Sequence, residues 1–387
     1  MTRIHCLNNI SKKGTDQLPA GYELVDDLAQ AEGVLVRSAQ LHETEFPASL
    51  LAIARAGAGV NNIPLDRCAE EGIVVFNTPG ANANAVKELV LCGMLLGSRG
   101  IIDGAIWCRD NADDPTIGKS AEKAKKAFAG REIMGKKLGV IGLGAIGALV
   151  ANAAIDLGME VIGYDPYVSV AAAWRISNRV KHTTNLEDIC RECDYITIHV
   201  PAMDSTKGMI GADQIALMKS DAVLLNFSRD TLVDEAALIA ALNDGKVGRY
   251  VTDFATPAIM GAKNAIVLPH LGASTEEAEE NCAVMAAAEI VDFIENGNIT
   301  NSVNFPAVDL GPRREVGQRI TVLHRNVPGV INGISAALAE HGHNVANMVS
   351  KSRGDYAYAI IDIDDKVGDD AHDKMSAREG VLRVRIF

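Results

Sequence analysis

The sequence is poor in aromatic residues, positive charge and long hydrophobic runs. Phe, Trp and Tyr make up 4% of its 387 residues, and the formal net charge is −13. An acidic chain is a poor general binder of nucleic acid or anionic membranes, although a few focused arginines can still bind a small anion. No apolar run reaches the length of a membrane span, and the N-terminus MTRIHCLNN does not resemble a signal peptide. We therefore expect a cytoplasmic protein with neither a nucleic-acid nor a membrane partner.

The cysteines are few and scattered. The chain has seven of them, as expected for reduced thiols in the cytosol. Cys190 and Cys193 form a single C-x-x-C pair, with no second pair and no histidines nearby. That pattern is a weak metal site, so we expect core or surface thiols and no bound metal.

Short apolar runs separated by helical stretches make up most of the chain. Such runs are typical of buried parallel strands. The first series includes GVLVRS, LAIARAG and GIVVFNTPG, followed by a long apolar helix at 82–100, and a second series begins at Lys137. Between them, residues 105–135 are polar and Lys-rich, which favours a surface connection with some helix. The pattern predicts two α/β domains with parallel sheets.

The C-terminal part follows a different order. Residues 305–317 contain Pro and Gly without periodicity, which predicts a linker. Beyond it, residues 318–387 give strand, helix, strand, strand, helix and strand in about 70 residues. That βαββαβ order is typical of a ferredoxin-like module.

The stretch VIGLGAIG carries Gly142, Gly144 and Gly147 in a G-x-G-x-x-G pattern. Alone the pattern is weak, but here an apolar strand precedes it, a helix follows, and the next strand ends at Asp165. Gly142 permits a tight turn, Gly144 lets a pyrophosphate approach the backbone, and Gly147 lets helix and strand pack closely. The alternative is a glycine-rich turn with no ligand.

A dinucleotide site here would prefer NAD to NADP. The helix N-terminus offers free N–H groups to the phosphates, and Asp165 can accept hydrogen bonds from the ribose hydroxyls. The carboxylate favours NAD and repels the 2′-phosphate of NADP. We expect further cofactor contacts at the helix start and at later strand ends, from Ala145, Ile146, Pro201, Ser228, Asp253 and Gly272.

Polar residues follow three later strands of the second series, in HVP, NFSRD and PHLGAST. Because ligands bind at the carboxyl ends of strands in open α/β sheets, Arg229 and His270 are expected to face one cleft. With VRSA, RAGAGVNN, VFNTPG, GLGAIG and SVNFP, these motifs make nearly the whole chain resemble the D-isomer-specific 2-hydroxyacid dehydrogenases. Within that family the likeness is to the enzymes that act on 3-phosphoglycerate.

The resemblance implies the chemistry. A hydride would move from C2 of 3-phosphoglycerate to NAD, giving 3-phosphohydroxypyruvate, the first step of phosphorylated L-serine biosynthesis. His270 would take the hydroxyl proton as general base, and Arg229 would hold the carboxylate and polarise the C2 oxygen. The alternatives are a helix-capping histidine and a surface arginine.

The resemblance also places the substrate on the N-terminal domain. The turn from Ala58 through Gly59 and Val60 to Asn61 would present backbone N–H groups to the carboxylate. Arg37 and Arg55 match family positions near the substrate phosphate, unless they are ordinary surface charges. Weaker candidates follow the NTPG motif, namely Lys87 and Asn82.

One family feature is missing. A glutamate that hydrogen-bonds the catalytic histidine usually precedes a proline, but here the segment reads TDFATPAIMG, with Thr256 at that position or the position deleted. Either Asp253 or Asp230 takes over the orienting role, or the histidine works without a carboxylate partner. Lys263 is a weaker alternative as the base.

The C-terminal module resembles an ACT domain, a small amino-acid-sensing fold. By that resemblance His324, Asn326 and Asn344 would bind L-serine between the ACT domains of two subunits, and serine would inhibit the enzyme. The other interpretation is a module used only for dimerisation. The family makes dimers through its cofactor domains, and ACT pairing builds tetramers, so we expect a homodimer or homotetramer.

The expected architecture is therefore two Rossmann/flavodoxin-like parallel-sheet domains flanking a cleft, plus a ferredoxin-like ACT domain. We assign residues 1–97 and 275–304 to a discontinuous substrate-binding domain, 98–274 to the NAD-binding domain, 305–317 to the linker and 318–387 to the ACT domain. The alternative functions are a dehydrogenase for another D-2-hydroxy acid, such as glycerate, or a catalytically inactive NAD-binding regulator.

Overall fold

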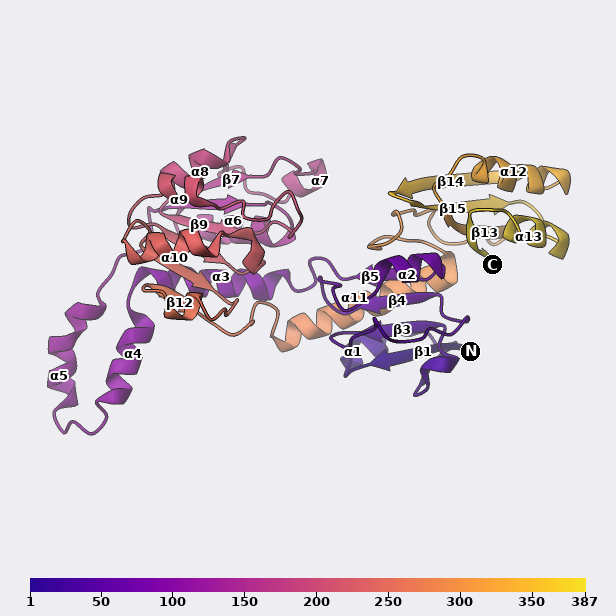
Figure 1. Cartoon of the computed structure of the whole chain (residues 1–387). Helices are drawn as coiled ribbons and strands as arrows, with labels where there is room; N and C mark the ends of the chain where they lie inside the picture. Colours follow the sequence, from indigo (N-terminus) through magenta and orange to yellow (C-terminus); the bar gives the residue numbers. More distant parts are fainter. The chain divides into compact units, whose positions relative to one another are not determined.

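The computed structural model describes residues 1–387, apart from the side chains of Ala171 and Asp369. The chain forms two compact units (Figure 1). The first unit combines Met1–Asn82 with Glu276–Phe387, and the second is Ala83–Thr275. Each unit contains one parallel sheet, and the first also contains an antiparallel sheet at its C-terminal end. The expected fold class, two parallel-sheet domains plus a ferredoxin-like module, is confirmed.

The first unit is built on a five-stranded parallel sheet with the order β2-β1-β3-β4-β5. Strand β3 is wholly buried, and β4 is buried except at its last residue, as expected for parallel strands covered on both faces. The strands are β1 (Thr2–Leu7), β2 (Tyr22–Val25), β3 (Gly33–Val36), β4 (Ala52–Arg55) and β5 (Val74–Asn77). The helices are α1 (Lys12–Thr15), η1 (Leu28–Gln30), α2 (Leu65–Glu70) and α11 (Glu276–Asn296).

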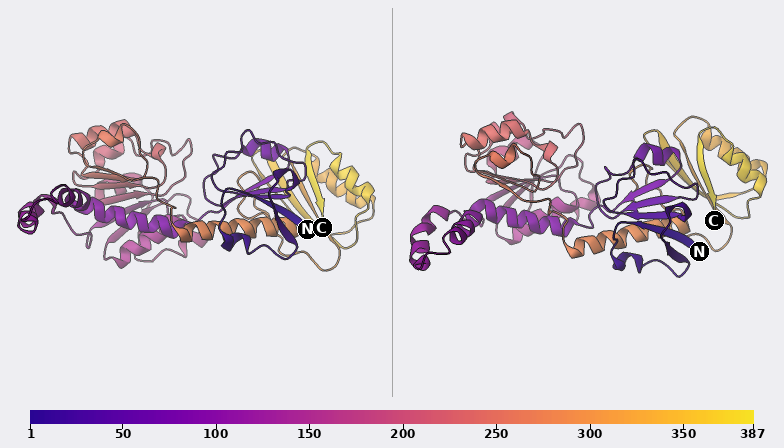
Figure 2. Two further views of the ribbon diagram at one scale, coloured as in Figure 1. Left: turned by 90° about the horizontal axis from the view of Figure 1, so that it is seen from below. Right: turned by 60° about the horizontal axis from the view of Figure 1, so that its bottom comes forward.

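Helix α11 returns to the first unit after the chain has passed through the second. Its buried face, including Ala286, Ile290 and Phe293, packs on β3, β4 and β5 (Figure 2). The helix ends before Gly297, which takes a left-handed φ of 73° that residues with a side chain rarely adopt.

The second unit contains a seven-stranded parallel sheet with the order β12-β11-β10-β9-β6-β7-β8. Its strands are β6 (Lys137–Ile141), β7 (Glu160–Tyr164), β8 (Lys181–Thr183), β9 (Tyr195–Ile198), β10 (Val223–Asn226), β11 (Arg249–Thr252) and β12 (Ala265–Val267). The sequence predicted a series of apolar strands from Lys137 onward, but β8 does not show that pattern, because it is short and largely exposed. The order reverses between β6 and β9. In open α/β sheets ligands bind at the carboxyl ends of the strands at such a reversal.

Helices cover both faces of this sheet. They are α3 (Ala83–Ser98), α6 (Ala145–Asp156), α7 (Val170–Ala173), α8 (Leu186–Glu192), α9 (Ala212–Leu217), α10 (Glu235–Asn243), and the short turns η3 (Asp230–Leu232) and η4 (Ile259–Gly261). The predicted polar connection holds α4 (Ile101–Asp110), α5 (Ile117–Ala124) and η2 (Lys125–Phe128), and Figure 1 shows α4 and α5 projecting from the unit as a hairpin. No side chain on α4 or α5 is buried.

No single helix among the described residues is long and apolar enough to cross a membrane. Helices α3 and α4 reach that length only when taken together, and they are bent by 70° relative to one another.

The C-terminal module has the predicted βαββαβ order. It consists of β13 (Gln318–Arg325), α12 (Val330–Glu340), β14 (Val345–Arg353), β15 (Tyr356–Ile363), α13 (Asp369–Ser376) and β16 (Val381–Ile386). The antiparallel sheet has the order β14-β15-β13-β16. Its two helices cover one face, where Ile320, Val322 and Ile361 pack with Ile334.

The other face of this sheet packs on the five-stranded domain. Leu323, Tyr358 and Ile360 share one core cluster with Phe76 and Phe293. Figure 2 shows the C-terminal sheet beside α11 in both views. The module is therefore joined to the first domain by a common hydrophobic core.

Arginines of the module also cap the end of α11, whose last carbonyls lack partners within the helix. Arg385 donates to the carbonyls of Phe293 and Ile294 at 3.0 and 2.7 Å. Arg319 donates to the Asn296 carbonyl at 2.9 Å and forms a buried bidentate pair with Asp362 at 2.7 and 3.0 Å.

The predicted linker at 305–317 contains no helix or strand, but it is not a free tether. Phe305 and Val308 are fully buried, and Val308 bridges to Ile299. Helix α3, which the sequence assigned to the substrate-binding domain, packs in the second unit with α6, β10 and β11. The functional domain limits otherwise stay a prediction.

Candidate active site

The glycine-rich turn sits where β6 gives way to α6. Gly142 has a left-handed φ of 90°, and a Cβ there would lie 2.7 Å from the His199 carbonyl oxygen. A Cβ on Gly147 would lie 1.9 Å from the Gly142 carbonyl oxygen. Gly144, in contrast, faces open space, with nothing within 4 Å of a Cβ position. Two glycines therefore shape the turn, and the third leaves room beside the N-terminus of α6 for a phosphate group.

Asp165 follows β7 and lies beside this turn. Its Oδ2 accepts the Leu143 N–H at 2.8 Å and its Oδ1 accepts the Tyr167 N–H at 2.8 Å. Each carboxylate oxygen keeps a further acceptor position. The aspartate thus holds the turn and can still accept hydrogen bonds from a ribose. These residues fit a dinucleotide.

The other predicted cofactor residues lie at the same edge of the seven-stranded sheet, because each follows the carboxyl end of a parallel strand. Ala145 and Ile146 begin α6, and Pro201 follows β9 as an exposed residue. The Ser228 hydroxyl donates to the Ile198 carbonyl at 2.6 Å, which links the ends of β10 and β9.

A half-buried histidine that the sequence reasoning missed lies beside the end of β9. Loss of solvent around its ring lowers the pKa of His199 to about 3, so the ring is neutral. The ring bonds the Thr197 hydroxyl at 2.9 Å, while Nδ1 has no partner among the described residues. It is the first residue of the HVP motif, and that place after β9 would have been its only signal.

Arg229 follows β10 at this edge. Its carbonyl accepts a hydrogen bond from the Asn226 side chain at 2.8 Å, and its Nη1 donates to the Ser228 carbonyl at 2.6 Å. The guanidinium is half-buried and forms no ion pair with any side chain that the structure describes. It therefore retains donors for an anionic ligand.

His270 follows β12 and is exposed. The edge of the Phe254 ring faces it, with 5.0 Å between ring centres. The predicted base and arginine thus follow the carboxyl ends of β12 and β10, two strands of one sheet that are separated by β11.

Asp253 lies directly beneath the histidine loop. Its side chain is 2% exposed, and its Oδ2 accepts the Gly272 N–H at 2.9 Å. Burial raises the pKa of this carboxyl, while the Gly272 N–H and the nearby His270 partly oppose the shift. Its Oδ1 has no partner among the described residues. Asp230 instead caps its own turn by accepting the Thr231 N–H at 2.8 Å. Of the two candidate acids, the structure brings Asp253 to His270.

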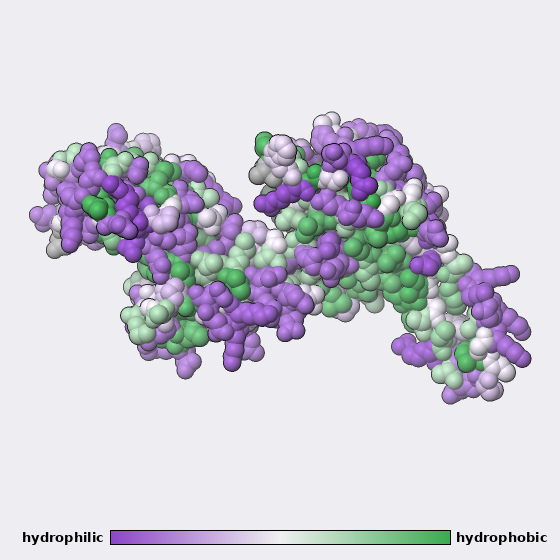
Figure 3. Space-filling view, turned by 180° about the vertical axis from the view of Figure 1, so that it is seen from behind, coloured by the Kyte–Doolittle hydropathy of each residue, from purple (hydrophilic) through white to green (hydrophobic). Residues whose placement is uncertain are grey.

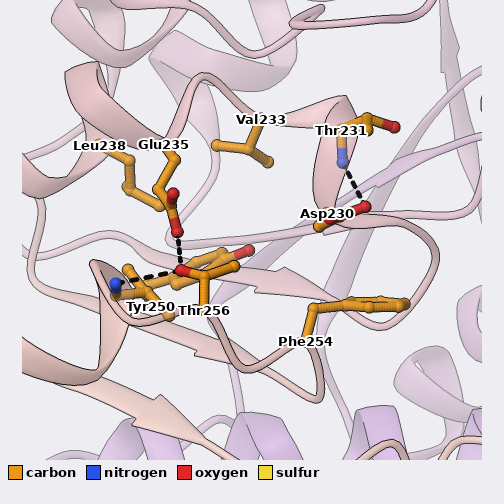
Figure 4. Close-up of a pocket in the computed structure, with 9 residues that line it drawn as sticks. Asp230, Thr231, Val233, Glu235, Leu238, Tyr250, Phe254 and Thr256 are labelled. Atoms are coloured by element: carbon orange, nitrogen blue, oxygen red, sulfur yellow. Dashed lines mark hydrogen bonds between the residues drawn. The ribbon is translucent and has the colours of Figure 1, made fainter.

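Thr256, at the position of the missing family glutamate, meets a carboxylate from another element. Its hydroxyl hydrogen-bonds Glu235, the first residue of α10, and also accepts the Ile259 N–H at 3.2 Å (Figure 4). Both residues line a pocket of about 190 Å³ that also contains Asp230, Tyr250 and Phe254. Sequence reasoning missed Glu235, because nothing in its local pattern points to Thr256.

Lys263 is not placed to act as the base. It lies in the loop that precedes β12, whereas His270 follows β12. The two residues are therefore at opposite ends of β12, so Lys263 cannot replace His270 as the base.

Cys190 and Cys193 are buried free thiols in the core. No group of three or more potential metal ligands occurs among the described residues.

The first unit carries a second candidate anion site at the carboxyl ends of β3 and β4. Arg37 follows β3 and Arg55 ends β4, and the Arg55 Nε donates to the Arg37 carbonyl at 3.0 Å. Two carbonyls of the turn after β4 are bound by side chains of the same unit. The Ala58 carbonyl accepts from the Asn77 side chain at 2.6 Å, and the Asn61 carbonyl accepts from the His42 ring at 2.9 Å.

The N–H groups of this turn are left over. Among the described residues, no hydrogen bond involves the N–H of Ala58, Gly59, Val60 or Asn61. Adjacent unpaired N–H groups make a concavity that suits an anion.

Lys87 lies on α3 and is paired with Asn84 at 2.5 Å and Glu88 at 3.9 Å. Asn82 is the last residue of the first unit before α3.

The three predicted effector residues lie at two ends of the C-terminal module. His324 and Asn326 lie at the carboxyl end of β13, where the α12 N-terminus follows. Asn344 precedes β14, whose start aligns through β15 with the opposite end of β13. At about 3.3 Å per residue, the two groups are roughly 20 Å apart.

Comparison with known proteins agrees with this geometry. The sequence model described as D-isomer specific 2-hydroxyacid dehydrogenase, NAD binding domain, matches residues 93–272, and the ACT domain model matches residues 318–378. D-3-phosphoglycerate dehydrogenase of Escherichia coli K12 is 33% identical over 386 residues, covering 94% of this chain and 89% of the relative. The enzyme of the same name from Haemophilus influenzae is 32% identical, covering 89% of this chain and 82% of the relative.

Solved structures agree as well. A cofactor (NAD+) bound 3-phosphoglycerate dehydrogenase from Entamoeba histolytica has a TM-score of 0.62 and 28% identity, covering 78% of this chain and 98% of that one. Among the relatives found by sequence, D-3-phosphoglycerate dehydrogenase of Methanocaldococcus jannaschii is 35% identical, covering 76% of this chain and 55% of the relative. The chain belongs to the D-isomer specific 2-hydroxyacid dehydrogenases, a family of NAD-dependent enzymes, and carries a C-terminal ACT domain.

Proposed function

We propose that this chain oxidises 3-phosphoglycerate to 3-phosphohydroxypyruvate with NAD, the first step of phosphorylated L-serine biosynthesis. The observation that carries the substrate assignment is the second anion site, with Arg37, Arg55 and the unpaired N–H groups from Ala58 to Asn61. A 2-hydroxy acid with a phosphate tail has two anionic ends, and a guanidinium is the side chain that best matches both. The relatives that match most of the chain bear the same activity in their names.

Residues at the carboxyl ends of the seven-stranded sheet would accept the C2 hydroxyl proton and bind the substrate carboxylate. His270 accepts the C2 hydroxyl proton while a carbonyl forms at C2, and Arg229 holds the carboxylate and stabilises charge on the C2 oxygen. NAD, when bound along the glycine turn, takes up the hydride that leaves C2. The Ala58–Asn61 turn orients the carboxylate through its N–H groups.

Asp253 takes the positioning role that the family assigns to a glutamate. Its carboxylate anchors the backbone of the histidine loop and is the acid near His270. An imidazolium formed during turnover is stabilised by a nearby carboxylate. Asp253→Asn should lower kcat and shift the limb of the kcat–pH profile that reports His270, whereas Asp230→Asn should leave it in place. An unchanged limb in Asp253→Asn would mean that the histidine works without an acid.

Serine regulation follows from the ACT domain. His324 is 3% exposed, its Nε2 has no partner among the described residues, and it lies on the strand that leads into the α12 N-terminus. A helix N-terminus with an unpaired imidazole suits a carboxylate ligand. Because Asn344 lies at the other end of the sheet, one serine can meet all three residues only between two subunits.

Serine titration tests this regulation. Millimolar serine should inhibit the wild type, and Asn326→Ala or Asn344→Ala should abolish the inhibition without changing kcat. Absence of inhibition in the wild type would mean that the ACT domain serves only in dimerisation.

Exposed apolar residues on the second unit support a homo-oligomer. Figure 3 shows apolar surface on the unit that bears the α4–α5 hairpin, and Leu95, Ile101 and Ile106 are each more than 40% exposed there. Apolar surface of this kind marks protein interfaces. A homodimer through this unit, and a tetramer through the ACT domains, is proposed in the cytoplasm, where the seven free thiols would stay reduced.

One assay separates the candidate functions. NADH formation is measured with 3-phosphoglycerate, glycerate and lactate, and the reverse reaction with 3-phosphohydroxypyruvate, for the wild type and His270→Ala. The proposal predicts activity on the phosphorylated pair alone, lost in the variant. Preference for glycerate would favour the other 2-hydroxyacid dehydrogenase, and no turnover with intact NAD binding would favour the inactive regulator.

A further inference from the structure

One carboxylate of the chain already occupies the second anion site. The Glu279 side chain, one turn into α11, pairs with Arg37, with 2.6 Å between Oε1 and Nη2. Both side chains are about two-fifths exposed, so the pair lies where a ligand can reach it. Arg37 is therefore neutralised by its own chain in the absence of substrate.

The neighbours show that this pair belongs to the site and is not an isolated surface contact. Arg55 donates to the Arg37 backbone, so the two guanidinium-bearing residues are held together. Cys282, three residues beyond Glu279 on the same helix face, lies close enough that Arg55, Arg37 and Glu279 all influence the pKa of its thiol, which burial raises. The carboxylate and both arginines thus lie on one small patch.

An anion that binds Arg37 must displace Glu279. A phosphate monoester carries a charge near −2 at neutral pH, whereas the carboxylate carries −1, so the phosphate displaces the carboxylate from Arg37. Its binding is weakened by the free energy needed to break the Arg37–Glu279 pair. A substrate whose tail is uncharged leaves the pair in place and loses nothing.

We propose that Glu279 is an internal competitor for the phosphate group of the substrate, which sets the affinity of the site and hastens product release. The proposal rests on the assignment of Arg37 to that phosphate. It makes Glu279 an affinity-determining residue that acts through Arg37 and not on the reacting atoms.

The expected effect is small and specific. Ion pairs between partly exposed side chains change equilibria by about two- to fivefold. Glu279→Gln should lower KM for 3-phosphoglycerate by that factor, with kcat unchanged or lower if release limits turnover. The KM for glycerate should stay the same.

Inorganic phosphate provides a test that needs no turnover. It is titrated into the full-length wild type, Glu279→Gln and Glu280→Gln, and its dissociation constant is measured by calorimetry. Glu280 is the matched control, because it is the next residue on α11 and pairs instead with Lys13 at 2.5 Å. Thermal melts verify that each variant is folded.

Glu279→Gln should bind phosphate about two- to fivefold more tightly than the wild type, and Glu280→Gln should match the wild type. Adding Arg37→Met to Glu279→Gln should remove the gain. Equal or weaker phosphate binding by Glu279→Gln would overturn the proposal, as would an equal gain in Glu280→Gln. Failure of the wild type to prefer 3-phosphoglycerate would overturn the proposed function instead, while the phosphate titration would still decide the role of Glu279.

Discussion

The two parallel sheets both carry a candidate anion site at the carboxyl ends of their strands, but the two sites consist of different groups. The seven-stranded sheet uses backbone: the glycines of the turn after β6 and the N-terminus of α6. The five-stranded sheet adds side chains to its turn, namely Arg37 and Arg55, one of which is paired with Glu279. The first site depends on conformation, and the second depends also on charge.

This difference decides how each site responds to change. A backbone site depends on residues within a few positions of one another, so steric changes should destroy it. A side-chain site depends on partners far away in the sequence, such as Asn77 and Glu279, and single charges should tune it. The predictions below test that contrast.

The largest effect is expected at the strand ends of the seven-stranded sheet that carry Arg229 and His270. His270→Ala should lower kcat for 3-phosphohydroxypyruvate reduction by about 10²- to 10⁴-fold, the range for loss of a general acid or base. NAD affinity, measured by NADH fluorescence, should be unchanged. His182→Ala, which alters an exposed histidine on β8, is the control. A loss of less than tenfold would remove His270 from the proton transfer.

The glycine turn should fail by two separable routes. Gly147→Ala places a Cβ against the Gly142 carbonyl, so both the melting temperature and NAD affinity should fall, the latter by about 100-fold or more. Gly144→Ala meets no protein atom, so it should weaken NAD binding while leaving the melting temperature unchanged. If both variants lose only stability, the turn does not bind the cofactor.

On the five-stranded side, a buried carboxyl should make stability depend on pH. Glu289 lies on α11, and its Oε1 accepts from Asn301 at 2.6 Å. Burial raises its pKa from 4.5 to about 7. Because the folded state holds this proton more tightly than the unfolded state, the stabilisation is present below about pH 4.5. It is lost as the pH rises through 7.

Glu289→Gln should therefore raise the free energy of unfolding at pH 8 by up to about 3 kcal/mol, with no gain near pH 4.5. Urea unfolding at the two pH values measures this. Glu315→Gln, at an exposed carboxyl, is the control. A gain that does not depend on pH would mean that Glu289 is ionised throughout.

The smallest effect is expected at the pocket beside Phe254. Glu235→Ala and Thr256→Val each remove the hydrogen bond that fixes the loop beside His270, and each should lower kcat by less than about tenfold. Because the two residues act through one contact, the double variant should be little worse than either single variant. Additive losses would show that the contact does not position the loop.

The sequence predicted the features that depend on local pattern. The glycine turn and the βαββαβ order of the C-terminal module are each determined by residues close together in the chain. The strand ends that carry Arg229 and His270 followed from the parallel arrangement. Their catalytic roles stay a prediction.

What the sequence could not predict depends on contacts between distant residues. Glu235 reaches Thr256 from another helix, and Glu279 reaches Arg37 across most of the chain. The packing of the ACT sheet on α11 was also missed, because Arg319 and Arg385 read as ordinary charges until the helix end they cap is known. Strand β8 was missed because it is short and carries no apolar run.

The ratio of kcat/KM for 3-phosphoglycerate to that for glycerate, in the wild type and in Arg37→Met, tests the central claim most directly. The claim is that the arginines of the five-stranded sheet select the phosphate tail. We expect a large ratio in the wild type and a loss of tenfold or more in the variant, the range of a charge-assisted bidentate contact. A ratio that is the same in both proteins would contradict the account.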